Sequence, residues 1–313
     1  MILLSIKKFY VIITLQKGEE MAEIFVSKVC GLCGGSKRAI ETTRELAKKE
    51  KQVVLFKEIL HNKNVLKELE KQGVQVKEKL EEIKQGDFVV VRAHGEPFVT
   101  FEHFDKNNIR YADCTCPNVK AINLLVKKKA EEGFKIIIVG KYGYGGKPMH
   151  PEVAGTAGWC PDPIFLEKEE EIETLCLTDK KYFLVVQTTF SRDLAEKMIE
   201  QVAKKMEREG KVFEYKNTIC NAQKNINIAS KELALTVDAM VVIGGKNSSN
   251  TKELFVAMSE VCPSFHIENE DEILQLISQG KFVGYNKIGL TAGASTMGED
   301  IEKIKAILEE KLN

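Results

Sequence analysis

The sequence predicts an α/β protein built from three similar units, each with a mostly parallel sheet. Short apolar runs of four or five residues alternate with longer amphipathic segments rich in Lys and Glu, as strands and helices do in parallel α/β folds. The order of these segments repeats three times along the chain. Its 313 residues, 43% hydrophobic and 29% charged, suffice for two or three domains with a well-buried core.

The apolar runs predict strands because a strand covered by helices on both faces needs apolar side chains on both. The predicted strands are Val53–Phe56, Phe88–Val91, Lys135–Val139, Phe183–Val186, Ala239–Ile243 and Lys287–Leu290. The predicted helices include Ser36–Lys49, Val65–Gln72, Val119–Glu132, Leu194–Glu209 and Asp300–Lys311.

Each repeat opens with a cysteine and a helix, continues through a strand to a polar loop, and then through a second helix and strand to another polar loop. The cysteines are Cys33, Cys116 and Cys220, the first loops contain His61, His150 and Ser248, and the second contain His94, Thr188 and Ser295. The spacing from cysteine to first loop is 28 residues in the first and third repeats and 34 in the second. A loop insertion in the glycine-rich stretch 140–149 accounts for the difference.

We place the units at 21–115, 116–216 and 217–313, the last ending in a C-terminal helix, and interpret residues 1–20 as an N-terminal extension. A short strand, Ile24–Val26, leads into Cys33 in the first unit. Ligands of open α/β sheets bind beyond the carboxyl ends of the strands. Three such units would therefore converge in a pseudo-threefold trefoil, with the cysteines and polar loops around one centre.

The charge balance argues for a small-molecule ligand, because 46 basic and 46 acidic side chains cancel. A nucleic-acid partner is not expected without a basic surplus. The apolar runs Met1–Ile6 and Phe9–Leu15 are too short to span a bilayer, so we expect no membrane association and a cytoplasmic location.

The eight cysteines favour metal binding or catalysis over a disulfide framework. Three thiolates from Cys33, Cys116 and Cys220 would hold an iron–sulfur cluster and leave one iron open to a substrate. Zinc or dithiol chemistry at the C-x-x-C pair of Cys30 and Cys33 stays open, as does a fourth thiolate from Cys30 or Cys114. We interpret the remaining three cysteines as small buried apolar residues: Cys160, Cys176 and Cys262.

Several polar loops suit an anionic, phosphorylated ligand. Ser248, Ser249 and Asn250 follow a strand and open a helix, where backbone N–H groups favour anions, although such residues are also ordinary helix caps. Ser295 lies in another turn of small residues. Three histidines in the strand-end loops could donate hydrogen bonds to phosphate oxygens, namely His61, His94 and His150.

In this order, the motifs resemble the family of 4-hydroxy-3-methylbut-2-enyl diphosphate reductases, from about residue 21 to the C-terminus. The motifs that carry the resemblance are Gly31–Ile40, His61–Asn62, Arg92–Gly95, Asp113–Pro117, His150–Val153, Gln187–Thr189, Thr218–Cys220, Gly245–Asn250 and Thr291–Ser295.

The resemblance implies a three-lobed α/β trefoil around a [4Fe–4S] cluster and a reductive removal of hydroxyl that yields isopentenyl and dimethylallyl diphosphates. It assigns Cys33, Cys116 and Cys220 to the cluster, and places His150, Glu152 and Thr188 near the substrate hydroxyl, with Glu152 in the proton relay. The residues it assigns to the diphosphate are His61, His94, Ser248, Asn250 and Ser295. Ferredoxin or flavodoxin would supply the electrons.

The sequence departs from the family pattern at Leu32, Ser36, the loop before His150, residues 223–227 and Met297. These departures keep open a divergent paralogue that reduces another allylic diphosphate. A non-catalytic iron–sulfur redox sensor is the alternative from a different class, although such a sensor needs neither Glu152 nor the diphosphate residues.

Overall fold

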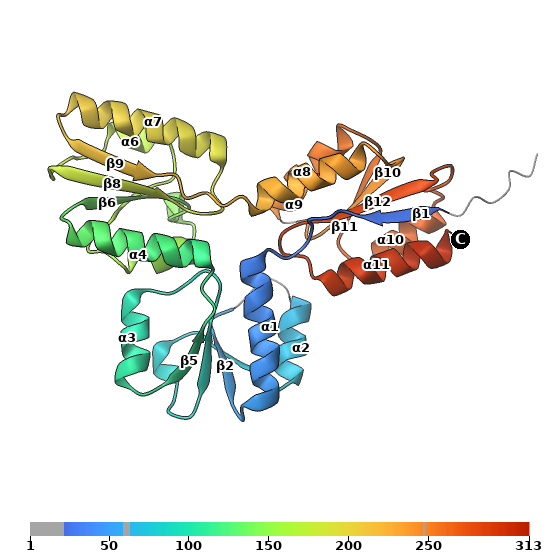
Figure 1. The fold of residues 1–313 in the computed structure, drawn as a ribbon, viewed down its shortest axis with the longest axis horizontal. Coiled ribbons are helices and arrows are strands. Elements are labelled where there is room, and N and C mark those ends of the chain that lie inside the picture. The colour runs from blue at the N-terminus through green and yellow to red at the C-terminus, as the bar shows by residue number, and fades with distance from the viewer. Residues whose placement is uncertain (1–21, 59–62, 247, 313) are drawn as a thin grey trace, which may run out of the picture. The chain divides into compact units, whose positions relative to one another are not determined.

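The computed structural model describes residues 22–58, 63–246 and 248–312, which form three four-stranded sheets with helices packed against them (Figure 1). Every strand pairing in these sheets is parallel. The predicted α/β class with three similar parallel units is therefore confirmed.

The first sheet has the order β3-β2-β4-β5. Its strands are β2 (Val53–Phe56), β3 (Gln75–Lys77), β4 (Phe88–Val91) and β5 (Arg110–Asp113), and its helices are α1 (Gly34–Lys49), α2 (Lys63–Lys71), η1 (Leu80–Glu82) and α3 (Phe98–Lys106). Alternate residues of the central strands point to opposite faces. Leu55 and Val90 pack with Ala39 and Ile40 of α1, whereas Val89 packs on the face that buries Phe104 of α3.

The second sheet has the order β7-β6-β8-β9. Its strands are β6 (Lys135–Val139), β7 (Ile164–Leu166), β8 (Lys181–Val186) and β9 (Val212–Lys216), and its helices are α4 (Pro117–Glu131), η2 (Tyr144–Gly146), α5 (Pro151–Ala157), α6 (Glu170–Glu173) and α7 (Arg192–Arg208). Helices α4 and α7 cover opposite faces of this sheet (Figure 1). Ile136 and Val185 contact the α4 side, and Ile137 and Leu184 contact the α7 side.

The third sheet has the order β11-β10-β12-β1. Its strands are β1 (Glu23–Val26), β10 (Ala239–Ile243), β11 (Ser264–Ile267) and β12 (Lys287–Ala292), and its helices are α8 (Ala222–Ala234), α9 (Ser249–Ser259), α10 (Glu270–Ser278) and α11 (Gly298–Lys311). All five residues of β10 are buried, which explains its uninterrupted apolar sequence.

In the first two sheets the second strand along the chain lies outermost, beside the first, and the third and fourth follow on the other side. In the third sheet β11, β10 and β12 take the same places as the first three strands of the others. Strand β1 takes the fourth position in the third sheet, where Ile24 pairs with Ile288 of β12. The boundaries predicted for the three units stay a prediction. Strand β1, predicted in the first unit before Cys33, belongs to the third sheet and not to the first. It covers the edge of β12, which the C-terminal part of the chain leaves without a fourth strand.

Two compact units divide the described residues. The larger comprises 30–228 and 293–297, and therefore holds the first two sheets. The smaller comprises 22–29, 229–292 and 298–312, and holds the third. In the part of the chain that the structure describes, no helix is both long and apolar enough to cross a membrane.

Candidate active site

The three predicted cluster cysteines occupy equivalent places in the repeat, just before a helix. Cys33 is the N-cap of α1, Cys116 is the N-cap of α4 with Pro117 as its first helical residue, and Cys220 lies two residues before α8. All three are half-buried and free of disulfides. Each of the three thiols therefore lies at the N-terminal end of a helix.

Cys33, Cys116 and Cys220 also lie near one another in the larger unit. A Cβ atom added to Gly35, in the first turn of α1, would lie 3.0 Å from the Cβ atom of Cys116 and 3.1 Å from its Sγ atom. Burial raises the pKa of Cys220, and negative charges on Cys33, Cys116 and Glu152 raise it further. Such interactions are appreciable only between close groups, so the three thiols and one carboxyl share a neighbourhood.

Glu152 is a buried carboxyl with a well-defined partner. It lies in the first turn of α5, its side chain is 3% exposed, and both of its oxygens bind Thr188. The Thr188 backbone N–H donates to Oε1 at 2.6 Å, and the Thr188 hydroxyl donates to Oε2 at 2.7 Å. The Thr188 carbonyl in turn accepts the backbone N–H of Cys220 at 2.9 Å. A short chain of bonds thus links the carboxyl to the backbone of a predicted cluster ligand.

Burial is the main influence on Glu152 and raises its pKa, while the two bonds from Thr188 act in the opposite direction. The result is a carboxyl that holds its proton above the ordinary pH range for glutamate. A protonated carboxyl can donate to the Thr188 hydroxyl, which can accept as well as donate. The pair is therefore able to store a proton and release it.

Two histidines face each other beside this pair. His150 is the N-cap of α5, and its Nδ1 atom accepts the backbone N–H of Glu152 at 3.2 Å. The rings of His94 and His150 meet edge to face, with centroids 5.5 Å apart. The accepted bond leaves Nε2 of His150 as the nitrogen that can carry a proton towards a ligand. The structure therefore brings two predicted substrate histidines together, from different sheets.

The loop before His150 is anchored at both ends. The side-chain Oε1 of Gln187 accepts the backbone N–H of Lys141 at 2.9 Å, and the carbonyl of Lys141 accepts the N–H of His150 at 2.8 Å. Further out, the Tyr142 hydroxyl donates to the carboxylate of Glu171. The longer loop of the second repeat is thus tied to the core and to α6.

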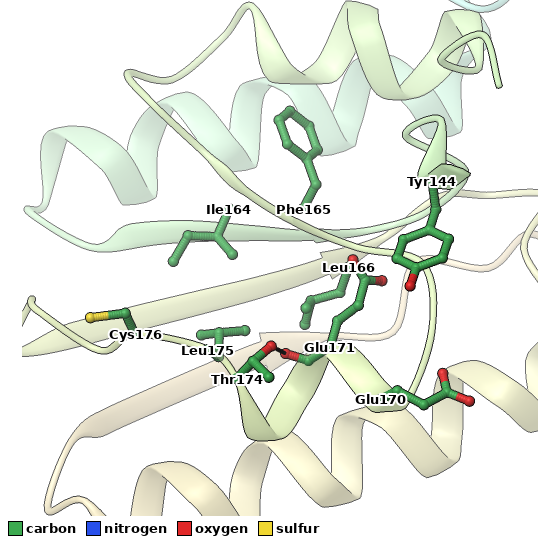
Figure 2. A pocket seen from close by; sticks show the side chains of 9 residues that line it. All are labelled: Tyr144, Ile164, Phe165, Leu166, Glu170, Glu171, Thr174, Leu175 and Cys176. Carbon is green, nitrogen blue, oxygen red and sulfur yellow. Dashed lines mark hydrogen bonds between the residues drawn. The ribbon is translucent and has the colours of Figure 1, made fainter. Parts of the chain in front are cut away.

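Glu171 also lines a hollow of about 480 Å³ beside the edge strand β7. Figure 2 shows Tyr144 on one side of this hollow and the side chains of β7 and the α6 region on the other. No predicted site residue lines it, and Glu171, one of its two carboxylates, already binds Tyr142 and backbone N–H groups. We therefore do not identify it as the active site.

Residues 293–297 belong to the larger unit and lie beside Cys33. The backbone N–H of Cys33 donates to the carbonyl of Ala294 at 3.4 Å, and that of Leu32 donates to Thr296 at 2.9 Å. Ser295, between these two acceptors, is half-buried. Strand β12 runs to Ala292, two residues beyond the predicted strand, so the turn of small residues that contains Ser295 begins at Gly293.

The remaining predicted anion ligands lie in the smaller unit or outside the described residues. Ser248 is the N-cap of α9 in the smaller unit, where its hydroxyl accepts the N–H of Thr251 at 3.3 Å, and Asn250 lies in the first turn. This confirms that Ser248 is a helix cap and leaves its binding role a prediction. His61 and the side chain of Ser249 lie outside what the structure describes.

The other cysteines differ from one another in exposure. Cys114 is buried, and burial raises the pKa of its thiol. Cys160 and Cys262 are half-buried, whereas Cys176 is exposed, so the expectation that it is buried was wrong. Cys176 lies in the irregular segment between α6 and β8. Among the described residues, no three His, Cys, Asp or Glu side chains form a site for a single metal ion.

Two contributors to this region were not predicted from the sequence. Gly35 allows α1 to approach Cys116, and the glycine pair directly after Cys33 is the signal that could have revealed it, because glycine is a poor helix former. Gln187 anchors the loop before His150, a role that its place in the Gln187–Thr189 motif did not predict.

Together, these features define a class of protein: an α/β protein with three parallel sheets and three neighbouring thiols beside a protonatable carboxyl. The family model described as "LytB protein" matches residues 24–309. This chain belongs to that family, and the resemblance noted from the sequence motifs is confirmed.

Curated relatives extend along nearly the whole chain. The 4-hydroxy-3-methylbut-2-enyl diphosphate reductase of Caldanaerobacter subterraneus subsp. tengcongensis is 38% identical over 301 residues, which cover 93% of this chain and 99% of the relative. The enzyme of the same name from Aquifex aeolicus is 34% identical over 296 residues, covering 93% and 97%.

Solved structures show the same relationship. A structure of (E)-4-hydroxy-3-methyl-but-2-enyl diphosphate reductase, described as the terminal enzyme of the non-mevalonate pathway, is 33% identical with a TM-score of 0.77, covering 93% of this chain and all of the other. The E-1-hydroxy-2-methyl-but-2-enyl-4-diphosphate reductase from Plasmodium falciparum is 29% identical with a TM-score of 0.70, covering 92% and 88%.

Proposed function

We propose that this chain is an oxidoreductase that converts 4-hydroxy-3-methylbut-2-enyl diphosphate to isopentenyl and dimethylallyl diphosphates. The reaction takes up two electrons and two protons, breaks the carbon–oxygen bond of the allylic alcohol, and releases water. The observation that carries the proposal is the buried Glu152–Thr188 pair, joined through the Thr188 carbonyl to Cys220. Full-length relatives of this name support the substrate.

The donor set fits an iron–sulfur cluster. Cys33, Cys116 and Cys220 are soft ligands free of disulfides. Burial raises the pKa of Cys220, negative charge on the other two thiols raises it further, and a cationic metal centre would relieve that repulsion. In a cluster each thiolate binds a different iron, so these sulfurs need not converge on one point. A [4Fe–4S] cluster bound here supplies electrons and, with three protein thiolates, one open iron site.

The protein residues would deliver the proton and orient the substrate. Glu152 would hold the proton needed to make hydroxyl a leaving group, and the Thr188 hydroxyl, 2.7 Å from Oε2, is placed to pass it on. His150 is fixed in orientation by its bond to the N–H of Glu152, so its second ring nitrogen can bind the substrate. The burial of Glu152 excludes water that could otherwise exchange this proton.

The diphosphate would bind to His61, His94, Ser248, Ser249, Asn250 and Ser295. Hydroxyl, amide and imidazole donors at helix and strand ends suit phosphate oxygens. We propose ferredoxin or flavodoxin as the electron donor and the cytoplasm as the location.

Anaerobic purification, with iron and sulfide analysis, tests the cofactor. Reduction of 4-hydroxy-3-methylbut-2-enyl diphosphate by the cluster-loaded enzyme with a reduced viologen tests the reaction. We expect cluster absorbance and both isoprenoid products. A fully loaded enzyme that binds the diphosphate without reducing it would refute the proposed function.

A further inference from the structure

Helix α5, which carries Glu152, packs unusually closely against the loop that carries His94. A Cβ atom added to Gly155 would lie 3.0 Å from the carbonyl oxygen of Gly95, and one added to Gly158 would lie 2.3 Å from Cβ of Pro97. The N–H of Phe98 donates to the carbonyl of Gly158 at 3.3 Å. Only glycine permits this approach of backbone to backbone. We call this close contact of Gly155 and Gly158 with residues 95–98 the joint.

A buried asparagine lies behind the joint. Asn123, in the second turn of α4, is 1% exposed. Its amide lies 2.9 Å from Oγ1 of Thr156 on α5. In the orientation that satisfies both ends of the amide, its nitrogen donates to Thr156 Oγ1 and its oxygen accepts Nε1–H of Trp159 at 3.2 Å. One side chain thus bridges α4, α5 and the residue that follows α5 by two positions.

The network continues into the His94 loop. Nε1–H of Trp159 also donates to the carbonyl of Glu96 at 3.0 Å, and the ring of Trp159 packs 5.1 Å from that of Phe98. The Glu96 carboxylate, 1% exposed, binds Lys57 Nζ at 2.6 Å and Arg92 Nε at 3.0 Å. The loop is therefore held on one side by two cations and on the other by Trp159.

These contacts connect three elements that carry proposed site residues. Thr156 is one helical turn after Glu152, and Asn123 is two turns after Cys116. Gly95 directly follows His94. An apolar interface could hold two helices together equally well, but it would tolerate sliding. A satisfied buried polar network fixes one arrangement, because any shift leaves buried groups without partners.

We propose that Asn123 is a positioning residue for the reductase reaction, an inference that rests on the function proposed above. By bridging Thr156 and Trp159, it holds His150 and Glu152 in fixed register with His94 and with the start of α4. Diphosphate binding depends on other donors as well, so the joint should govern turnover more than affinity.

The test compares Thr156→Val, which removes the hydroxyl at constant shape, with Thr156→Ser, which retains it. Both are made as cluster-loaded enzyme, with Thr174→Val, at an exposed threonine, as the control. We expect Thr156→Val to lower kcat about tenfold or more, because small displacements of catalytic groups are costly, while KM stays within about threefold. Thr156→Ser should keep kcat within about twofold of the wild type.

Trp159 is the only tryptophan in the chain, so its fluorescence reports on the joint independently of catalysis. Acrylamide quenching of Trp159 should increase in Thr156→Val and not in Thr156→Ser. Trp159→Phe provides a second activity variant, which keeps a ring but removes the N–H donor, and we expect it to lower kcat as well.

Near-normal kcat in both Thr156→Val and Trp159→Phe, with full cluster content, would overturn the proposal, as would an equal loss in Thr156→Ser. Failure of the proposed function would look different, because the wild-type enzyme itself would then be inactive. In that case the quenching measurement still decides: unchanged quenching in Thr156→Val would rule out the positioning role of the joint.

Discussion

Replacing Glu152 by glutamine separates the proton of the carboxyl from its hydrogen bonds. The amide oxygen of glutamine can still accept the N–H of Thr188, which now meets Oε1 at 2.6 Å. The amide nitrogen would replace Oε2, 2.7 Å from the Thr188 hydroxyl, and that hydroxyl can turn to accept from it. The variant therefore keeps the geometry of the site but has no proton to give.

The expected magnitude distinguishes the two roles. Weakening one hydrogen bond costs about 1 kcal/mol, or about fivefold in rate. Losing a positioned general acid costs about 10²-fold or more, which corresponds to about 2.7 kcal/mol. We expect Glu152→Gln to bind the cluster and the diphosphate normally and to lose kcat by at least the larger factor.

The assay is steady-state reduction of the diphosphate with excess reduced viologen, so that electron supply does not limit turnover. Glu170→Gln, which removes an exposed carboxylate on α6, is the matched control and should retain wild-type kcat. A loss of only fivefold or less in Glu152→Gln would show that Glu152 orients Thr188 rather than donating a proton. Weakened diphosphate binding with unchanged kcat would assign Glu152 to substrate positioning.

Four further measurements test the site. The cluster absorbance should be lost in Cys33→Ser, Cys116→Ser and Cys220→Ser and kept in Cys30→Ser and Cys114→Ser. Full absorbance in Cys220→Ser would contradict the ligand assignment. Loss of absorbance in Cys30→Ser or Cys114→Ser would indicate a fourth thiolate. Gly35→Ala places a methyl group 3.1 Å from Sγ of Cys116 and should lower the iron content of purified protein, a result that normal iron content would exclude. Asn250→Ala should weaken inorganic pyrophosphate binding roughly tenfold by calorimetry, with Ser259→Ala at the other end of α9 as the control, and equal affinities would remove Asn250 from the anion site. Burial raises the folded-state pKa of Glu152 above its ordinary 4.5, so the protonated carboxyl contributes its full stability to the fold below pH 4.5. That contribution to the free energy of unfolding is lost as pH rises through the folded-state pKa, at up to about 1.4 kcal/mol per pH unit. The thermal midpoint of Glu152→Gln should therefore rise relative to that of the wild type as pH increases, and a difference that does not change with pH would contradict the raised pKa.

The sequence alone determined the central strands of the fold. The six apolar runs correspond to β2, β4, β6, β8, β10 and β12, which are the two inner strands of each sheet. Inner strands are covered on both faces and both edges, so their residues are apolar without interruption. The outer strands are mixed in character, as in Arg110–Asp113 and Val212–Lys216, because one edge and part of a face meet water.

The sequence also determined which residue types the proposed chemistry needs, through the repeated cysteines and polar loops. Only the tertiary structure decided how they combine. Strand β1 completes the third sheet because long-range pairing, not sequence order, fills the edge of β12. Local patterns carry no record of the contact between Glu152 and Thr188, 36 residues apart, or of Asn123 and Thr156, 33 apart. Helix packing brings these groups together, and burial gives Glu152 its raised pKa.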